Sequence, residues 1–175
     1  MGKRRARRGP ARLVASRVLR DISRGFILKY PEGLKFECTR CGRCCRERAI
    51  LLLPEDVERL SAAYGLDPEE FAEPVEGLDP YTHKMKKRNG ACVFYRDGEC
   101  TVYPHRPLAC RFYPFALLPF EGEYVFILLE KCPGVGRGNT LGREFFEELL
   151  ALYFKWALDR MAKHVRRAVG GVTLA

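Results

Sequence analysis

The sequence predicts an α+β protein, in which a small, irregular, cysteine-rich metal-binding core with short β-hairpins is flanked by an N-terminal helix and a long C-terminal helix. Three observations lead to this prediction. Four of the eight cysteines stand within residues 38–45. Turn pairs at 89–90 (Asn-Gly) and 97–98 (Asp-Gly) separate short stretches, as they do in β-hairpins. Apolar residues recur at helical spacing near both ends of the chain.

The length of 175 residues suits one domain of ordinary size, which we divide into three parts. They are a basic arm and helix over 1–24, a cysteine-cluster metal-binding domain over 25–135, and a C-terminal helix over 136–175 that packs on the core. No apolar run approaches the roughly 18–20 residues of a membrane span. The basic start has no apolar segment behind it, so no secretory signal is expected. These features favour a soluble, cytoplasmic protein with no transmembrane segment.

Local signals define the elements of the first half of the chain. Residues 11–26 are predicted to form a basic amphipathic helix, and residues 49–53 a short apolar strand. The next helix opens with Pro54, which a first turn tolerates, and ends at Gly65. Asp67 caps a short helix that stops at Pro74. Residues 82–102 are predicted to form the hairpins.

The second half begins with a rigid aromatic stretch over 102–115 that carries one cysteine. Two apolar strands, 116–120 and 124–129, flank a turn at 121–123. A Gly-rich loop over 134–138 then leads to a long helix over about 140–168. The broad apolar stripe of this helix, which contains aromatic residues, indicates core packing rather than a cofactor site.

The run from Cys38 to Cys45 has the pattern C-x-x-C-x-x-C-C. Thiolates at C-x-x-C spacing can converge on one centre, because a short turn places both sulfurs on the same side. Cys38, Cys41 and Cys44 match the first three ligands of bacterial ferredoxin runs. Gly42 supplies φ freedom and room where the chain wraps closely around such a centre. Buried structural cysteines have no reason to fall at this spacing, so the run predicts a metal or cluster site.

The remaining cysteines, apart from Cys45, are widely spaced: Cys92, Cys100, Cys110 and Cys132. Structural zinc usually takes two compact ligand pairs, and this spacing does not form a zinc ribbon. Three clustered thiolates plus one remote thiolate are typical of a [4Fe–4S] cluster. The last ligand of ferredoxins often precedes proline, so Cys132, before Pro133, is the first candidate and Cys110 the next.

The role of Cys45 stays open. Adjacent residues of an extended chain point in opposite directions, so Cys44 and Cys45 need not serve one centre. Eight cysteines allow two four-thiolate sites, or one site and a disulfide from Cys45 to a later cysteine. The chain has no Gln and only two Asn among abundant Arg and Glu, a composition seen in hyperthermophiles, whose intracellular proteins can carry disulfides.

Charged side chains near Cys110 are candidates to support a centre. Arg106 and Arg111 flank this cysteine, and guanidinium hydrogen bonds would offset the negative charge of cluster thiolates. Surface salt bridges are the alternative role for both arginines. His105, five residues before Cys110, is a candidate ligand, whereas His83 and His164 are expected to be solvated.

The net charge of +9 is concentrated at the N-terminus, where residues 1–24 hold nine Lys or Arg and one acidic residue, Asp21. Such an arm could contact nucleic acid or an anionic surface. No aromatic residue or motif accompanies these charges. We therefore favour a solvated helix that packs one apolar stripe on the body of the protein.

The cysteines, together with Tyr103-x-x-Arg106-Pro107-x-x-Cys110-Arg111-x-Tyr113-Pro114, resemble the YkgJ-type cysteine-cluster family, a zinc- or iron-chelating domain, over about residues 34–135. The resemblance implies a metal- or iron–sulfur-binding domain with ligands among Cys38, Cys41, Cys44, Cys45, Cys92, Cys100, Cys110 and Cys132. A related domain occurs in flagellin lysine N-methylases, so the resemblance also implies methyl transfer as a candidate function. This short chain shows no separate domain for a methyl donor.

The favoured hypothesis is a protein that holds one [4Fe–4S] cluster through Cys38, Cys41, Cys44 and a later cysteine. Its role would be redox or accessory, in a larger modification system with a protein partner whose identity the sequence does not reveal. The second hypothesis is a zinc-stabilised binding module that contacts nucleic acid or a protein. The third is a component that transfers methyl groups to protein lysines.

Overall fold

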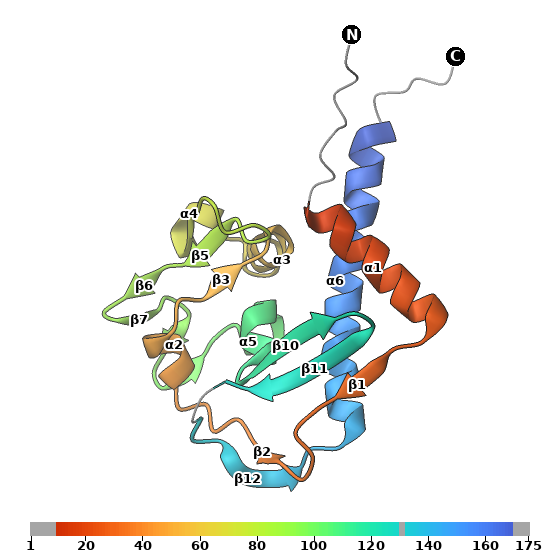
Figure 1. The fold of residues 1–175 in the computed structure, drawn as a ribbon. Coiled ribbons are helices and arrows are strands. Elements are labelled where there is room, and N and C mark those ends of the chain that lie inside the picture. Colours follow the sequence, from red (N-terminus) through yellow and green to blue (C-terminus); the bar gives the residue numbers. More distant parts are fainter. Residues whose placement is uncertain (1–9, 130–131, 170–175) are drawn as a thin grey trace.

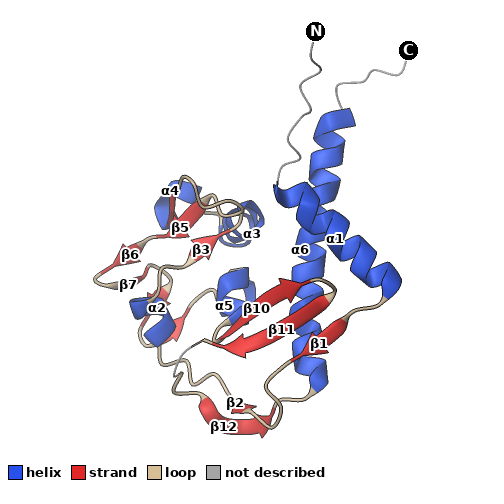
Figure 2. Cartoon of the chain, viewed as in Figure 1, coloured by secondary structure: helices blue, strands red, loops and turns tan. Residues whose placement is uncertain are grey.

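The computed structural model describes residues 10–129 and 132–169. A cysteine-rich module with short strands lies beside a small sheet that is backed by a long helix (Figure 1). Helices and short strands alternate along the described chain (Figure 2). The predicted α+β class, with a helix at each end, is confirmed. None of the described helices combines the length and apolar character that a bilayer crossing requires.

The cysteine-rich module is built on one hydrophobic cluster that includes Leu52, Leu60 and Phe71. Helices α3 (Pro54–Tyr64) and α4 (Pro68–Phe71) accompany an antiparallel sheet in the order β3 (Leu51–Leu52), β5 (His83–Met85), β4 (Ala72–Pro74). Two hairpins follow, β6 (Lys87–Arg88) with β7 (Ala91–Cys92) and β8 (Tyr95–Arg96) with β9 (Glu99–Cys100). Both predicted hairpin turns are therefore confirmed.

A second hydrophobic cluster lies between a three-stranded sheet and the C-terminal helix α6 (Arg143–Val169). Strand β1 (Ile27–Lys29) pairs in parallel with β11 (Glu123–Leu128), which pairs antiparallel with β10 (Phe115–Phe120). The register places Phe115, Tyr124 and Phe126 on the buried face, where their rings contact aromatic residues of α6. Helix α1 (Pro10–Arg24) crosses α6 and contributes the buried Val18 (Figure 1).

The Gly-rich segment after Cys132 differs from its prediction. We expected a loop over 134–138, but β12 (Val135–Thr140) pairs antiparallel with β2 (Lys35–Phe36), with an irregular register. Two close approaches explain the glycines: a Cβ on Gly134 would stand 2.2 Å from the Glu37 carbonyl oxygen, and one on Gly138 would stand 2.6 Å from the Glu37 Cβ. Glycine therefore serves strand pairing at these two positions.

Short helices appear where the sequence predicted no regular structure. They are α2 (Arg43–Glu47) in the cysteine run, and the 3₁₀ turn η1 (Tyr103–His105) and α5 (Leu108–Phe112) in the aromatic stretch. Each is at most five residues long, which is too short for apolar periodicity to show in the sequence.

Candidate metal centre

The cysteine run borders a cavity of about 430 Å³. Seven thiols line it: Cys38, Cys41, Cys44, Cys45, Cys100, Cys110 and Cys132. The eighth cysteine, Cys92, is buried in the hydrophobic cluster against which Cys44, Cys100 and Cys110 also pack. The fold thus brings cysteines from the whole length of the module to one place.

Gly42 gives the cysteine run its shape. Its φ of +68° lies in the left-handed region, and a Cβ at this position would stand 2.0 Å from Cζ of Tyr95. The chain therefore turns directly against the Tyr95 ring, which explains why glycine is required. Two donors hold the turn, because Arg46 Nη2 and the Tyr95 hydroxyl donate to the Cys41 carbonyl at 2.9 Å and 3.3 Å.

Cys44 and Cys45 lie in α2, and both line the cavity. The sequence argument assumed an extended chain here, with the two side chains on opposite sides, and this assumption was wrong. The interaction between the neighbouring Cys44 and Cys45 thiols, with help from the charge of Arg48, lowers the pKa of Cys44 to about 6. The same interaction, together with burial, raises the pKa of Cys45. Of the two cysteines in α2, Cys44 is therefore the one that ionises more readily.

The hairpins and α5 bring three further cysteines to the same side of the module. Cys92 ends β7, Cys100 ends β9, and Cys110 lies in the middle of α5. Burial raises the pKa of Cys92 to about 11, and it also raises the pKa values of Cys100 and Cys110. With Cys45, these cysteines form an inner group of four thiols that packs on the first hydrophobic cluster.

Strand pairing brings Cys132 to the start of the cysteine run. The Glu37 N–H donates to the Gly134 carbonyl at 3.1 Å, and the Val135 N–H donates to the Cys132 carbonyl at 3.0 Å. Burial raises the pKa of the Cys132 thiol, and negative charge on Cys41 and Cys38 adds to the effect. Cys38, Cys41 and Cys132 therefore form an outer group of thiols. Cys44 lies between the outer and the inner group, because it lines the cavity and also packs on the first hydrophobic cluster.

Both predicted arginines line the cavity, and each has a defined position. The Arg106 guanidinium carbon lies 3.9 Å from the centre of the Tyr103 ring. Arg111 donates from Nε to the Arg106 carbonyl at 3.1 Å and from Nη2 to the Pro104 carbonyl at 2.8 Å. Burial and the charges of Arg59 and Arg106 lower the pKa of Arg111. Neither arginine has an ion pair to a carboxylate among the described contacts, in contrast to the salt-bridge alternative.

His105 and His83 are not among the residues that line the cavity. Nδ1 of His105 stands 3.2 Å from the Tyr64 hydroxyl, and the rings of the two residues contact edge to face. His83 lies in β5, where Nδ1 stands 2.9 Å from Oγ1 of Thr82. Neither lines the thiol cavity. The side chain of His164 lies outside the described residues.

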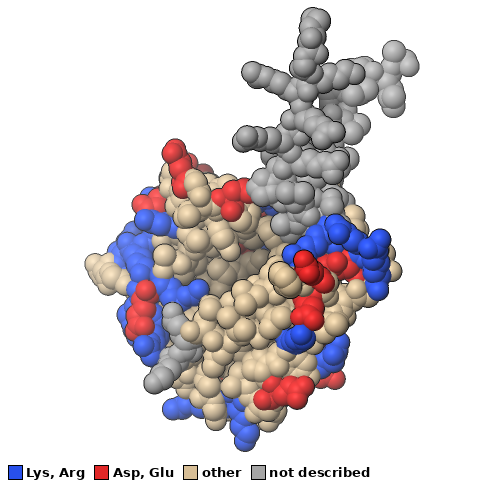
Figure 3. All heavy atoms as spheres, viewed as in Figure 1, with Lys and Arg blue, Asp and Glu red and all other residues tan. Residues whose placement is uncertain are grey.

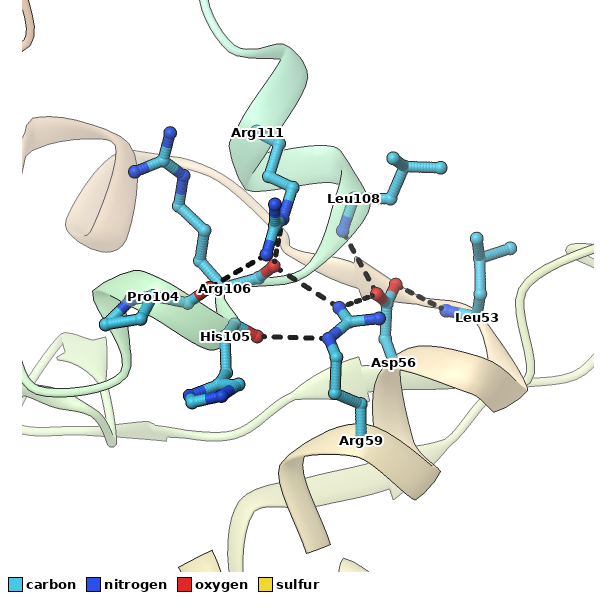
Figure 4. A network of polar contacts seen from close by, with 8 residues as sticks. All are labelled: Leu53, Asp56, Arg59, Pro104, His105, Arg106, Leu108 and Arg111. Carbon is cyan, nitrogen blue, oxygen red and sulfur yellow. Dashed lines mark hydrogen bonds and ion pairs between the residues drawn. The ribbon is translucent and has the colours of Figure 1, made fainter. Parts of the chain in front are cut away.

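Sequence reasoning missed the buried residue Asp56, which positions α5 (Figure 4). Its carboxylate accepts from the backbone N–H of Leu108 at 3.1 Å and of Leu53 at 3.2 Å, and it pairs with Arg59 at 2.5 Å. Arg59 also donates to the Arg106 carbonyl at 3.3 Å. The network anchors the segment that carries Cys110. The third position of a helix, where Asp56 stands, was the available signal.

The walls of the cavity also include aromatic and apolar residues to which the sequence analysis gave no role in the site. Three tyrosines line it, and each contacts an arginine: Tyr95 with Arg46, Tyr103 with Arg40 and Arg106, and Tyr113 with Arg48. Helix α6 closes another side with Phe145, Glu148, Leu149 and Leu152. The C-terminal helix, expected only to pack on the core, thus also borders the thiols.

The thiols surround a cavity and do not converge on the position of a single metal ion. Within the described ranges, no three His, Cys, Asp or Glu side chains are arranged so that they could hold one metal ion. The cavity volume of about 430 Å³ is many times the roughly 30 Å³ that one water molecule occupies in the liquid. The donor set is almost purely thiol, which suits zinc or iron–sulfur chemistry.

Comparisons with known proteins agree with the donor set. Residues 37–133 match the family model CxxCxxCC, described as a "putative zinc- or iron-chelating domain". The chain is 26% identical over 154 residues to the uncharacterized protein MJ0661 of Methanocaldococcus jannaschii, an alignment that covers 79% of this chain and 80% of that protein. No solved structure matches the chain.

Proposed function

The chain belongs to the CxxCxxCC family of zinc- or iron-chelating domains, and from this membership we propose that its thiol-lined cavity holds a [4Fe–4S] cluster. The cluster would serve a redox or accessory role in a larger modification system. The observation that carries the proposal is the cavity itself, which is bordered by all three cysteines of the C-x-x-C-x-x-C pattern and by Cys132.

The volume and the spacing of the thiols favour a cluster over a single zinc ion. A zinc ion draws four sulfurs to about 2.3 Å and leaves no space between them. A cubane cluster has its own volume and needs its thiolates further apart. Three ligands from a C-x-x-C-x-x-C run and a remote cysteine before proline form the ferredoxin pattern. The β2–β12 pairing supports Cys132 as the fourth ligand, because it brings this residue next to the run.

In this proposal Cys38, Cys41, Cys44 and Cys132 would hold the cluster, which supplies one-electron chemistry when bound. Gly42 allows the run to wrap tightly, and Arg46 and Tyr95 fix the Cys41 carbonyl. Arg106 and Arg111 place positive charge at the same cavity, which would offset the negative thiolates and raise the reduction potential.

The inner group, Cys45, Cys92, Cys100 and Cys110, contains four thiols of its own. Its members belong to the first hydrophobic cluster or pack against it, whereas Cys38, Cys41 and Cys132 are not among the residues of that cluster. This arrangement supports the open alternative of two four-thiolate sites. A second centre would double the metal content of the chain, so the metal content distinguishes the two versions.

The proposed division into an arm over 1–24, a metal domain over 25–135 and a helix over 136–175 assigns the cluster to the middle part. The α6 residues at the cavity indicate that the last part also shields the centre. The basic arm is the proposed contact for nucleic acid or an anionic surface, and residues 1–9 of it lie outside the described residues.

The deciding experiment is a visible spectrum with iron, sulfide and zinc analysis on full-length protein purified without oxygen. We expect a brown protein with about four irons and four sulfides per chain, or about eight of each if both groups are occupied. A colourless protein that contains zinc would overturn the cluster and favour the zinc-stabilised binding module.

Substitutions then test the ligands. Cys41→Ser and Cys132→Ser should lose the colour and the iron of the outer group, whereas Thr39→Ser, inside the same run, should keep both. Full iron content in the two cysteine variants would show that the outer group is not the ligand set.

A further inference from the structure

A second cavity of about 320 Å³ lies on the other side of α5 from the thiols. Leu108 and Phe112 of α5, Leu117 of β10 and Leu53, which precedes α3, supply its apolar walls. In the space-filling view the surface is hollowed between α3 and β10, and the hollow is lined mainly by uncharged residues (Figure 3). Its size and apolar lining are those of a small-molecule site.

The polar side chains of this cavity are hydrogen-bond donors. They are Arg48, Tyr81, Tyr153 and Trp156, and no Asp or Glu is among the described residues that line the cavity. Nε1 of Trp156 is buried and has no hydrogen-bond partner among the described residues. A buried donor without a partner costs free energy, which an acceptor on a ligand would recover.

Arg48 is the only cation among the lining residues that the structure describes. It contacts the face of the Tyr113 ring, with 4.6 Å from the guanidinium carbon to the ring centre. No ion pair joins it to a carboxylate in the described part of the chain. Its positive charge therefore has no carboxylate opposite it among the described residues, and an entering carboxylate would supply one.

We propose that this cavity binds a small carboxylic acid as its anion, with an apolar aromatic or branched body. The apolar walls from α5 and β10 would take the body, and Arg48 with the tyrosine and tryptophan donors would take the carboxylate. The ligand would also press on α5, whose Cys110 and Arg111 line the thiol cavity on the opposite side. The site itself requires no metal, so it stands or falls separately from the cluster.

The chain supplies its own reporter, because Trp156 is its single tryptophan and lines the cavity. Full-length protein is titrated with 3-phenylpropionate, and with the neutral 3-phenylpropionamide as the matched control. We expect a saturable change in tryptophan fluorescence with the acid and binding about tenfold or more weaker with the amide. No saturable change with the acid, or equal affinity for the two probes, would overturn the proposal.

Two pairs of variants locate the binding. Ala116→Phe adds bulk in the lining, whereas Leu118→Phe, two residues further along β10, adds bulk on an exposed position outside it. Arg48→Gln removes the cation, and Arg20→Gln removes an exposed charge of α1. Ala116→Phe and Arg48→Gln should weaken binding about tenfold or more, and their controls should not. Unchanged affinity in Ala116→Phe, with metal content and melting temperature retained, would place the ligand elsewhere.

Discussion

Tyr124 donates a 2.7 Å hydrogen bond to Oδ2 of Asp21, and both side chains are buried. The bond joins α1 to the central strand of the sheet, more than a hundred positions later in the sequence. Arg17, 3.6 Å from the same carboxylate, supplies the compensating charge. The lone acidic residue of the N-terminal arm thus adds a polar attachment to the packing of α1 on α6.

We expect Tyr124→Phe to lower the free energy of unfolding by about 1.5–3 kcal/mol, because it leaves a buried carboxylate without its hydroxyl donor. Urea unfolding measures the change. Tyr30→Phe is the control, since its ring stacks on Phe146 and the substitution keeps that ring contact. Equal losses in both variants would contradict a special role for the Asp21 bond.

Stability should also fall at high pH through Tyr124. Burial and then the bond to Asp21 raise its pKa above the ordinary value of about 10. Above about pH 10 the unfolded chain releases this proton while the folded protein keeps it, so the free energy of unfolding decreases as pH rises. Unfolding measured between about pH 8 and pH 11 should show a shallower decline in Tyr124→Phe than in the wild type.

Gly42→Ala should destabilise the protein more than Gly33→Ala does. Both residues have positive φ, +68° and +70°, so each alanine has a backbone cost of about 1–2 kcal/mol. Only the Cβ at Gly42 meets another group, the Tyr95 ring, while the one at Gly33 meets nothing within 4 Å. Gly42→Ala should in addition lose metal. Equal metal content and equal melting temperatures in the two variants would mean that the Tyr95 ring moves aside without a loss of stability.

Gly134→Ala tests the approach of Cys132 to the cysteine run. The new methyl group would clash with the Glu37 carbonyl oxygen and force β12 away from β2. We expect lost iron with the far-ultraviolet circular dichroism retained, since the buried residues of the two hydrophobic clusters lie outside β2 and β12. Gly136→Ala is the control: its φ of +83° gives the alanine a backbone cost, but its Cβ meets nothing within 4 Å, so it should keep its iron.

Asp56→Ala should cost about 3–5 kcal/mol, because it orphans two backbone donors, at about 1–3 kcal/mol each, and removes the part-buried pair with Arg59. The exposed pair of Arg143 and Glu147 provides the contrast, and Glu147→Ala should cost at most about 1 kcal/mol. Chemical unfolding of both variants gives the comparison. A loss below about 1 kcal/mol in Asp56→Ala would show that α5 is held by packing alone.

The sequence was sufficient for features with a local signal. The turns at 89–90 and 97–98, the helix from Pro54 to Gly65 and the left-handed Gly42 each depend on neighbours within a few residues. The C-x-x-C-x-x-C-C run identified the family for the same reason, because its meaning lies in its spacing.

Features that depend on long-range contacts were beyond the sequence. The pairing of β12 with β2 involves residues a hundred positions apart, and a Gly-rich segment carries no strand propensity. The burial of Asp56 depends on the Leu108 N–H, which only the folded chain brings near. Helix α2 was missed because five residues contain too little periodicity, so the argument about Cys44 and Cys45 started from an extended chain that the structure does not have.

Strand β2 has only two residues, and its pairing with β12 is irregular. Few hydrogen bonds between these strands therefore hold together the two ends of the segment from Cys38 to Cys132. A centre bound to both cysteines would cross-link Cys38 and Cys132. Like a disulfide across the same span, this cross-link would lower the conformational entropy of the unfolded chain. Metal binding would then stabilise the β2–β12 pairing. Slower amide exchange at Glu37 and Val135 in the loaded protein would be its signature.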